Sequence, residues 1–226
     1  MVAKFENINK TFCTSAGTYN WNEETSINLH KGEILLISGK SEYSRKNFLT
    51  LMGCTINPNE GILEINGKNI NLSCYEEMAS IKSQTIGFVF HQHNLLESIN
   101  TEENVAFPLK IENLKSDEIR QKTTEALKMV EMYDHRKKMP KQLSKLEKQQ
   151  ILIARALIIN PQIMVCDKPT ALLDRQSGVL IMKKLKELAN QGKTIVILNH
   201  DPRFNEYANR AVEVKNGIVN ELILVK

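Results

Sequence analysis

The sequence predicts an α/β protein with a mostly parallel sheet and helices on its faces. Apolar, strand-like runs alternate with segments whose apolar residues recur at helical spacing, and one long helical block interrupts this alternation. The 226 residues, 42% of them hydrophobic, suffice for one large domain with a sizeable core. We therefore expect a single domain over residues 1–226, with a β-rich and α/β part at about 1–90 and 161–226 and a helical lobe at about 91–160.

The first part of the chain is rich in strand patterns. Residues 2–36 alternate like short strands, except for the polar stretch 11–22, which we expect to be a loop. Residues 33–38 form an apolar strand, and residues 48–52 continue as a helix. Residues 61–68 alternate and end in Asn-Gly, which is typical of a hairpin.

A continuous apolar run at 85–90 then predicts a buried strand, after which the pattern becomes helical. Residues 116–118 supply cap-type side chains for one helix, and Pro140 separates that helix from the next, at 145–159. We further expect a strand at 163–166, a helix at 178–190, a strand at 194–198 and a closing hairpin at 211–225 around Asn216-Gly217.

Composition excludes some classes of function. A net charge of +4 is too small to indicate nucleic-acid binding. The four cysteines form no C-x-x-C pair and no metal-site spacing, so we interpret them as reduced structural thiols. No signal-peptide pattern and no apolar run of membrane-spanning length is present, so we expect any membrane role to come through a partner.

Residues 37–49 occupy the place of a phosphate-binding loop between a strand and a helix. A working loop reads G-x-x-x-x-G-K-[ST]: its glycines let backbone N–H groups surround the phosphates, and its hydroxyl binds Mg²⁺. Gly39 is the first glycine, but Ser44, Arg45 and Lys46 replace the second glycine, the lysine and the hydroxyl residue. Taken alone, such a segment favours an ordinary strand–turn–helix connection.

Over its full length, however, the chain resembles the nucleotide-binding domain of ABC transporters, of the lipoprotein-release, macrolide-exporter and cell-division (LolD, MacB and FtsE) type. The resemblance rests on the order and spacing of several segments: 10–12, 86–90, 94–96, 103–109, 140–144, 153–157, 160–161, 167–170, 173–174 and 199–201. It implies a P-loop NTPase (RecA-like) core with an N-terminal antiparallel β subdomain and an inserted α-helical subdomain.

The resemblance also assigns site positions. The nucleotide-binding positions, altered in this chain, are Phe12, Gly39, Ser41, Ser44, Arg45, Lys46, Asn47 and Asp167. The catalytic positions hold Lys168, His91 and His200, the signature holds Ser144, Lys145, Leu146 and Glu147, and the D-loop holds Asp174. The permease-docking positions are His91, Asn94, Leu95 and Leu96, the last three in a loop that we expect to be exposed, with partial burial of the two leucines as the alternative. No metal site is assigned.

Several of these residues conflict with ATP hydrolysis. Ser44 adds a Cβ beside the phosphates, and Lys46 puts an ammonium where Mg²⁺ lies, a repulsion of several kcal/mol even at an effective dielectric of about 20. Lys168 replaces the catalytic glutamate, and a lysine protonated at neutral pH cannot accept a proton. His91 replaces the glutamine that reaches metal and water. We expect Glu42 and Asp167 to neutralise Arg45 and Lys46 internally.

The signature is altered as well. In the family, Leu-Ser-Gly-Gly-Gln opens a helix whose N-terminus faces the γ-phosphate of the other subunit. Here Ser144 is kept, whereas Lys145 and Leu146 replace the glycines that allow close approach. In a dimer, we therefore expect both the phosphate-binding loop and the signature segment of this chain to bind nucleotide poorly.

Four kept residues have two interpretations each. Asp167 is an acidic group beside a metal or, preferably, an ion-pair partner of Lys46 or Lys168. Phe12 stacks on adenine or packs on a strand edge, and His200 contacts a γ-phosphate or is structural. Asp174 fits a dimer-contact and turn residue better than a catalyst.

The sequence therefore predicts an ABC-type subunit with little or no ATPase activity, a structural or regulatory partner of a membrane permease. We expect it on the inner face of the cell membrane, as a homodimer or as a heterodimer with another ABC ATPase, with no required cofactor beyond, at most, ATP without Mg²⁺. The alternatives are a weak or metal-independent ATPase that drives export or extrusion, in which Arg45 and Lys46 neutralise the phosphates, and a free cytosolic regulator.

Overall fold

The computed structural model describes residues 1–14, 17–72, 74–90, 94–111, 114–199, 201–215 and 218–223, and in the first two strands it describes no side chains from residue 12 to 24. His91, His200, the side chain of Phe12 and the turn Asn216-Gly217 lie outside this description. Among the described residues no helix is long and apolar enough to cross a membrane.

Two sheets form the scaffold. An antiparallel sheet has the order β2-β1-β4-β5, made of β1 (Ala3–Thr14), β2 (Gly17–Leu29), β4 (Glu60–Ile65) and β5 (Lys68–Asn69). A mostly parallel sheet has the order β10-β9-β3-β8-β7-β6, made of β3 (Ile34–Ser38), β6 (Ile86–Val89), β7 (Ile163–Asp167), β8 (Thr194–Leu198), β9 (Arg210–Lys215) and β10 (Ile218–Leu222). Only β10 pairs in the antiparallel sense, with β9.

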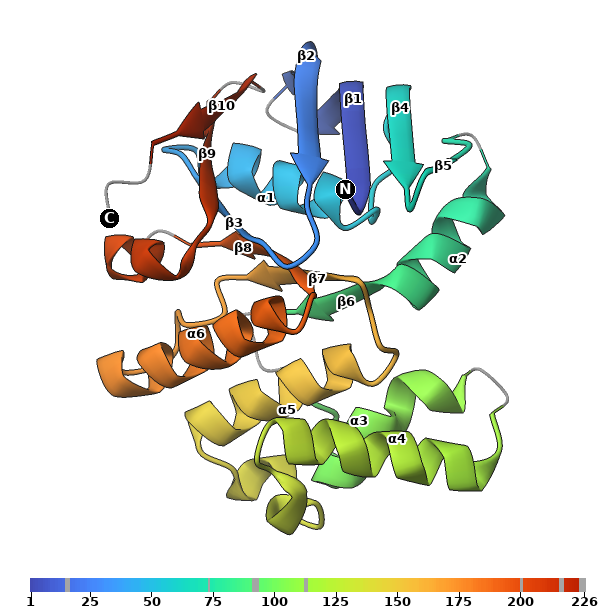
Figure 1. The fold of residues 1–226 in the computed structure, drawn as a ribbon, viewed down its shortest axis with the longest axis vertical. Coiled ribbons are helices and arrows are strands. Elements are labelled where there is room, and N and C mark those ends of the chain that lie inside the picture. Colours follow the sequence, from blue (N-terminus) through green and yellow to red (C-terminus); the bar gives the residue numbers. More distant parts are fainter. Residues whose placement is uncertain are drawn as a thin grey trace.

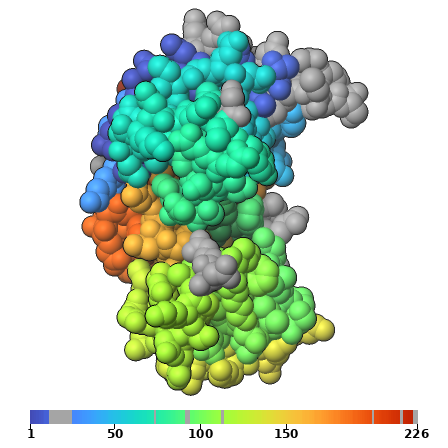
Figure 2. Space-filling model, turned by 90° about the vertical axis from the view of Figure 1, so that its right-hand side faces the viewer, coloured from blue at the N-terminus to red at the C-terminus, as the bar shows by residue number. Residues whose placement is uncertain are grey.

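The helices lie between and below these sheets (Figure 1). The helices are α1 (Glu42–Met52), α2 (Tyr75–Thr85), α3 (Thr101–Lys110), α4 (Ser116–Met129), α5 (Lys145–Leu157) and α6 (Arg175–Asn190), with the 3₁₀ turns η1 (Tyr133–His135), η2 (Pro140–Gln142) and η3 (Pro202–Tyr207). Helix α1 lies between the two sheets, α5 and α6 cover the other face of the parallel sheet, and α3 and α4 lie beyond α5. Figure 2 shows α3 and α4 in a lobe below the part that carries β4 and α2. The α/β fold class is confirmed.

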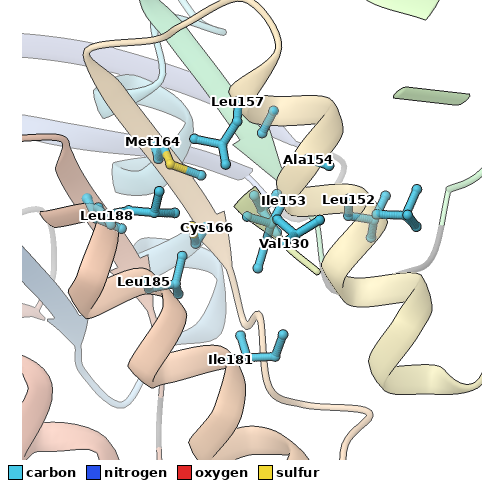
Figure 3. Packing of buried hydrophobic residues seen from close by; sticks show 14 of the residues in the cluster. Val130, Leu152, Ile153, Ala154, Leu157, Met164, Cys166, Ile181, Leu185 and Leu188 are labelled. Carbon is cyan, nitrogen blue, oxygen red and sulfur yellow. The ribbon is translucent and has the colours of Figure 1, made fainter. Parts of the chain in front are cut away.

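Strict alternation along the central strands builds two cores. Leu35, Ile37 and Val165 face α1 and the antiparallel sheet, whereas Leu36 and Cys166 face the opposite core. That second core is formed with α5 and α6, where Leu152, Ile153, Leu157, Ile181, Leu185 and Leu188 pack against β7 (Figure 3). Because both faces of the sheet are covered, these strands read as continuous apolar runs in the sequence.

Gly87 fixes how β6 meets the helical lobe. A Cβ at this position would lie 2.6 Å from the carbonyl oxygen of Ala156, so the β6 backbone touches the α5 backbone. Helix α5 joins the parallel sheet to α3 and α4 at this contact.

Several local predictions need correction. Within the polar stretch 11–22, residues 11–14 pair with residues 17–20, with Thr11 opposite Asn20, because a β ladder is made by backbone groups and does not require apolar side chains. Helix α6 begins at Arg175, three residues before the expected start, since Asp174 caps it, and α5 ends at Leu157 rather than at 159. Helix α2 was not predicted at all: its apolar residues are few, and Met78 alone is buried.

Candidate functional site

The loop after β3 is organised around its own hydrogen bonds. Ser41 is the N-cap of α1: its hydroxyl accepts a hydrogen bond from the N–H of Ser44 at 3.2 Å, and its carbonyl accepts from the N–H of Arg45 at 3.2 Å. Ser44 is buried, as are Asn47 and Phe48, which hold the first turns of α1 in the core. In a working loop, the N–H groups at the start of this helix bind phosphate. Here the N–H groups of Ser44 and Arg45 both donate to Ser41.

Gly39 is kept for a reason that does not involve a phosphate. Its φ of 138° lies in a region that side chains disfavour, and a Cβ here would lie 2.3 Å from the carbonyl oxygen of Val214 in β9. The loop packs against the backbone of β9, and only glycine fits there.

Arg45 does not present its charge to the outside. The side chain is buried, and Nη1 donates a hydrogen bond to the carbonyl oxygen of Gly39. The buried Nε has no hydrogen-bond partner among the described residues. The guanidinium therefore binds the loop's own backbone, and the expectation that Glu42 or Asp167 neutralises it is not what the structure shows.

Glu42 instead forms an ion pair with Lys168. The Nζ atom of Lys168 lies 2.5 Å from Oε1 of Glu42, so the pair joins the first turn of α1 to the end of β7. The Lys168 side chain is 13% exposed and that of Glu42 is 68% exposed. Lys168 also has a positive φ of 46°, a left-handed conformation that costs an L-residue about 1–2 kcal/mol.

Lys46 and Asp167 lie on one cavity. Lys46 is exposed, Asp167 is buried at the end of β7, and both line a space of about 460 Å³. Lys46 forms no ion pair with another residue that the structure describes, so the predicted pairing with Asp167 is not observed.

These residues do not fit a Mg²⁺–nucleotide complex. Lys46 takes the place of the metal-binding hydroxyl in the loop sequence, Lys168 closes onto the carboxylate of Glu42 beside the loop, and the Arg45 guanidinium points inward. Within the described part of the chain, no group of three or more His, Cys, Asp or Glu is placed to hold a metal ion.

The signature segment caps its own helix. Ser144 and Glu147 form a capping box on α5: the Ser144 hydroxyl accepts from the N–H of Glu147 at 3.2 Å, and the Glu147 carboxylate accepts from the N–H of Ser144 at 2.7 Å. The same carboxylate lies 2.6 Å from Nδ1 of His135 and 3.4 Å from Nζ of Lys138. Lys145 is exposed and Leu146 packs partly against the helical core.

The environment of Glu147 favours its charged form. Burial opposes ionisation, but the hydrogen bonds from Ser144 and the charges of Lys138 and His135 outweigh it and lower the pKa of Glu147 below its ordinary 4.5. A carboxylate therefore already occupies the helix N-terminus at neutral pH.

Asp174 has a similar local role in α6. It is the N-cap, accepting hydrogen bonds from the N–H of Ser177 at 3.0 Å and from its hydroxyl at 2.7 Å. These hydrogen bonds lower the pKa of the exposed Asp174 carboxyl. The interpretation of Asp174 as a turn residue agrees with this geometry.

The predicted docking loop is anchored from two helices. Arg155 of α5 donates hydrogen bonds to the backbone and side-chain oxygens of Asn94, at 3.0 and 2.5 Å. Asn104 of α3, fully buried, bonds the N–H and carbonyl of Leu96 at 2.8 and 3.0 Å. Leu96 is 38% exposed, whereas Leu95 is only 6% exposed and belongs to the core, so for Leu95 the alternative of a buried leucine holds.

A groove of about 450 Å³ lies near this loop, between α2, β6, α3 and α5. Its apolar lining includes Phe90, Pro108, Ile111 and Ile159, and Arg155 and Lys82 add positive charge. Phe90 is 41% exposed and Ile111 is 74% exposed. The docking positions assigned from the sequence do not include Lys82 and Ile111, which belong to the unpredicted helix α2 and to the end of α3.

Comparison with known proteins identifies the family. The model of the ABC transporter family matches residues 23–171. The uncharacterized ABC transporter ATP-binding protein YknY of Bacillus subtilis is 30% identical over 214 residues, which cover 95% of this chain and 93% of YknY. This chain therefore belongs to the ABC transporter ATP-binding proteins, as its motifs indicated.

Longer relatives and solved structures agree. The macrolide export ATP-binding/permease protein MacB of Chlorobium luteolum is 34% identical over 212 residues, but the chain spans only 32% of that protein. A dimeric structure of the ATP-binding cassette MJ0796, in a post-hydrolysis state bound to ADP and Pi, superposes with a TM-score of 0.85 at 33% identity, covering 99% of both chains. CbiO1 of Clostridium perfringens, part of an ABC transporter complex, superposes with a TM-score of 0.86 at 27% identity, covering 97% of this chain and 86% of CbiO1.

Proposed function

We propose that this chain is an ABC transporter subunit that has lost most of its ATPase machinery and acts as a structural or regulatory partner of a membrane permease. The observation that carries the proposal is the Lys168–Glu42 ion pair, which places an ammonium at the position of the general base and couples it to the phosphate-binding loop. In this proposal no cofactor is required, and any ATP binds without Mg²⁺.

The partners follow from the relatives. MacB combines an ATP-binding part with a permease in one protein, and CbiO1 belongs to a transporter complex. We extend this arrangement to the present chain: a separate permease holds it on the inner face of the cell membrane. MJ0796 is dimeric in its solved structure, and we expect either a homodimer or a heterodimer here.

The groove between α2, α3 and α5 is the proposed permease contact. Its lining is mostly apolar and also includes the polar side chains of Lys82, Ser83 and Arg155, a composition that suits a docking surface. The loop carrying Leu96 is held in place by Arg155 and Asn104. A preset loop loses less conformational entropy on binding than a free one.

The buried guanidinium of Arg45 argues against a metal-independent ATPase. That mechanism needs Arg45 and Lys46 to neutralise phosphates, but Arg45 is turned toward the carbonyl of Gly39. The exposed apolar groove argues against a free cytosolic regulator, because it would then lack a covering partner.

Calorimetric titration with ATP, with and without Mg²⁺, tests the proposal. We expect weak or absent binding that Mg²⁺ does not improve. A matched control variant carries Ser44→Gly, Arg45→Lys and Lys46→Ser, which rebuild the loop and should improve binding. Tight binding of MgATP by the unchanged protein would contradict the proposal.

A further inference from the structure

The proposed function assigns no ligand to the cavity that Lys46 and Asp167 line. It lies between α1, α2 and the ends of β6 and β7, and its volume of about 460 Å³ is that of a pocket for a small molecule. We propose that it binds a small amphipathic anion: an aromatic or aliphatic body with a single carboxylate, sulfonate or phosphate group.

The walls of the cavity supply the apolar part. Leu49 of α1, Val165 of β7 and the rings of Phe88 and Phe90 line it. The two rings are stacked, with centroids 5.8 Å apart and planes inclined by 7°. A flat, apolar body can pack against such a surface, and burial of apolar area supplies most of the affinity in sites of this kind.

Two lysines supply the charge. Lys46 of α1 and Lys82 of α2 are both exposed and line the same cavity, and neither pairs with a carboxylate among the described residues. Asp167 is the only acidic group in the described lining, so the side chains carry two positive charges and one negative charge. This excess favours a ligand with one negative group, and it is insufficient for a nucleoside triphosphate.

The cavity adjoins the groove assigned to the permease. Lys82, Phe88 and Phe90 line both spaces. A ligand in the cavity therefore contacts the wall of the groove, and the inference that it alters docking rests on the proposed function. Binding of the ligand itself does not rest on it.

Titration with anilinonaphthalene sulfonate, an aromatic monoanion whose fluorescence rises on binding, tests the pocket. We expect saturable binding of one probe per chain, with methyl NMR shifts at Leu49 and Val165. Uncharged phenylnaphthylamine and methanesulfonate, which carry only the body or only the charge, should each bind at least about tenfold more weakly. Binding that does not saturate, or no binding at all, would overturn the proposal.

Charge reversal locates the site. Lys46→Glu and Lys82→Glu should each lower the affinity for the probe about five- to tenfold. Lys183 is an exposed lysine of α6 outside the cavity lining, and Lys183→Glu should change this affinity less than about twofold. Circular dichroism checks that each variant is folded. Equal effects of all three variants would refute the pocket.

A parallel titration with MgATP separates the two proposals. Tight MgATP binding would contradict the loss of ATPase machinery and leave the probe result standing. Failure of the probe with weak MgATP binding would contradict the pocket alone.

Discussion

At the scale of single residues, Lys168 combines an unfavourable backbone conformation with an ion pair that contributes little stability. Its left-handed φ of 46° costs about 1–2 kcal/mol, whereas an ion pair to a mostly exposed carboxylate contributes about 0–1 kcal/mol. The ion pair therefore does not offset the backbone cost, and the strand end must be held in place by its neighbours, such as the bond from the N–H of Lys168 to the carbonyl of Leu198 at 2.9 Å.

The first prediction concerns this backbone. The free energy of unfolding of Lys168→Gly should be about 1 kcal/mol larger than that of Lys168→Ala. Glycine adopts a positive φ without a Cβ clash, and both variants lose the same ion pair. Urea denaturation of the two variants measures the difference. Greater stability of the alanine variant would show that residue 168 is not left-handed in solution.

A second prediction concerns Gly39. Gly39→Ala should lower the free energy of unfolding by at least about 2 kcal/mol in the absence of any nucleotide, since its Cβ meets the carbonyl of Val214 in β9. Gly67→Ala is the matched control: it also has a positive φ, of 76°, but its Cβ meets nothing within 4 Å. Equal effects at the two positions would contradict the packing role of Gly39.

A third prediction follows from Glu147. Its pKa is lower in the folded chain, so its charge stabilises the fold above the ordinary pKa of 4.5, and this contribution is lost as the pH falls through the lowered value. The wild type should exceed Glu147→Gln in stability by a few tenths to about 1 kcal/mol at pH 7, and the gap should close as the pH falls through the lowered pKa of Glu147. Thermal unfolding across this pH range measures it, and a gap that persists at acid pH would contradict the assignment.

At the scale of elements, the sequence predicted the hairpins and strands that a local pattern marks, such as a turn motif or a continuous apolar run. The Asn66-Gly67 hairpin formed as predicted, with both residues at positive φ. The buried strands β3, β7 and β8 formed where continuous apolar runs lie. Helix α2 was missed because Met78 is its one buried residue, so its sequence lacks the apolar periodicity that predicts a helix.

The candidate site was predictable in its identities but not in its contacts. The order of motifs assigns Ser44, Lys46 and Lys168 to site positions through the family resemblance, and that assignment stays a prediction. Pairing of Lys168 with Glu42 joins residues 126 positions apart, and it depends on how β7 and α1 are placed by the whole sheet. No local pattern carries that information, and the inward turn of Arg45 depends on the same packing.

The loop 94–96 gives a fourth prediction. Leu96→Asp should leave the protein folded but release it from a membrane fraction that contains its permease, because Leu96 is exposed beside the groove. Leu95→Asp buries a carboxylate in the core and should lower the free energy of unfolding by at least about 3 kcal/mol. Sedimentation with membranes and thermal unfolding distinguish the two; a membrane-bound Leu96→Asp variant would remove Leu96 from the interface.

At the scale of the whole molecule, the proposed loss of activity rests on both lobes. In that proposal the loop, the end of β7 and the start of α5 each oppose hydrolysis, because their side chains are engaged with the protein itself. Groups that act together are strongly non-additive, so repair of one obstacle leaves the others limiting.

The fifth prediction tests this distribution. Lys168→Glu alone should show no ATPase above background, and it also places a carboxylate against Glu42. Activity should need Ser44→Gly, Arg45→Lys, Lys46→Ser, Lys168→Glu and glycines at Lys145 and Leu146 together. Phosphate release measures turnover, and recovery by Lys168→Glu alone would show that the other changes matter little.

The contact at Gly87 has a mechanical consequence. The β6 backbone lies against the α5 backbone with no room for a methyl group between them. Any side chain at residue 87 would therefore have to push β6 and α5 apart, and the helical lobe would be displaced from the parallel sheet. The spacing between the two lobes is thus set by the absence of a single side-chain atom.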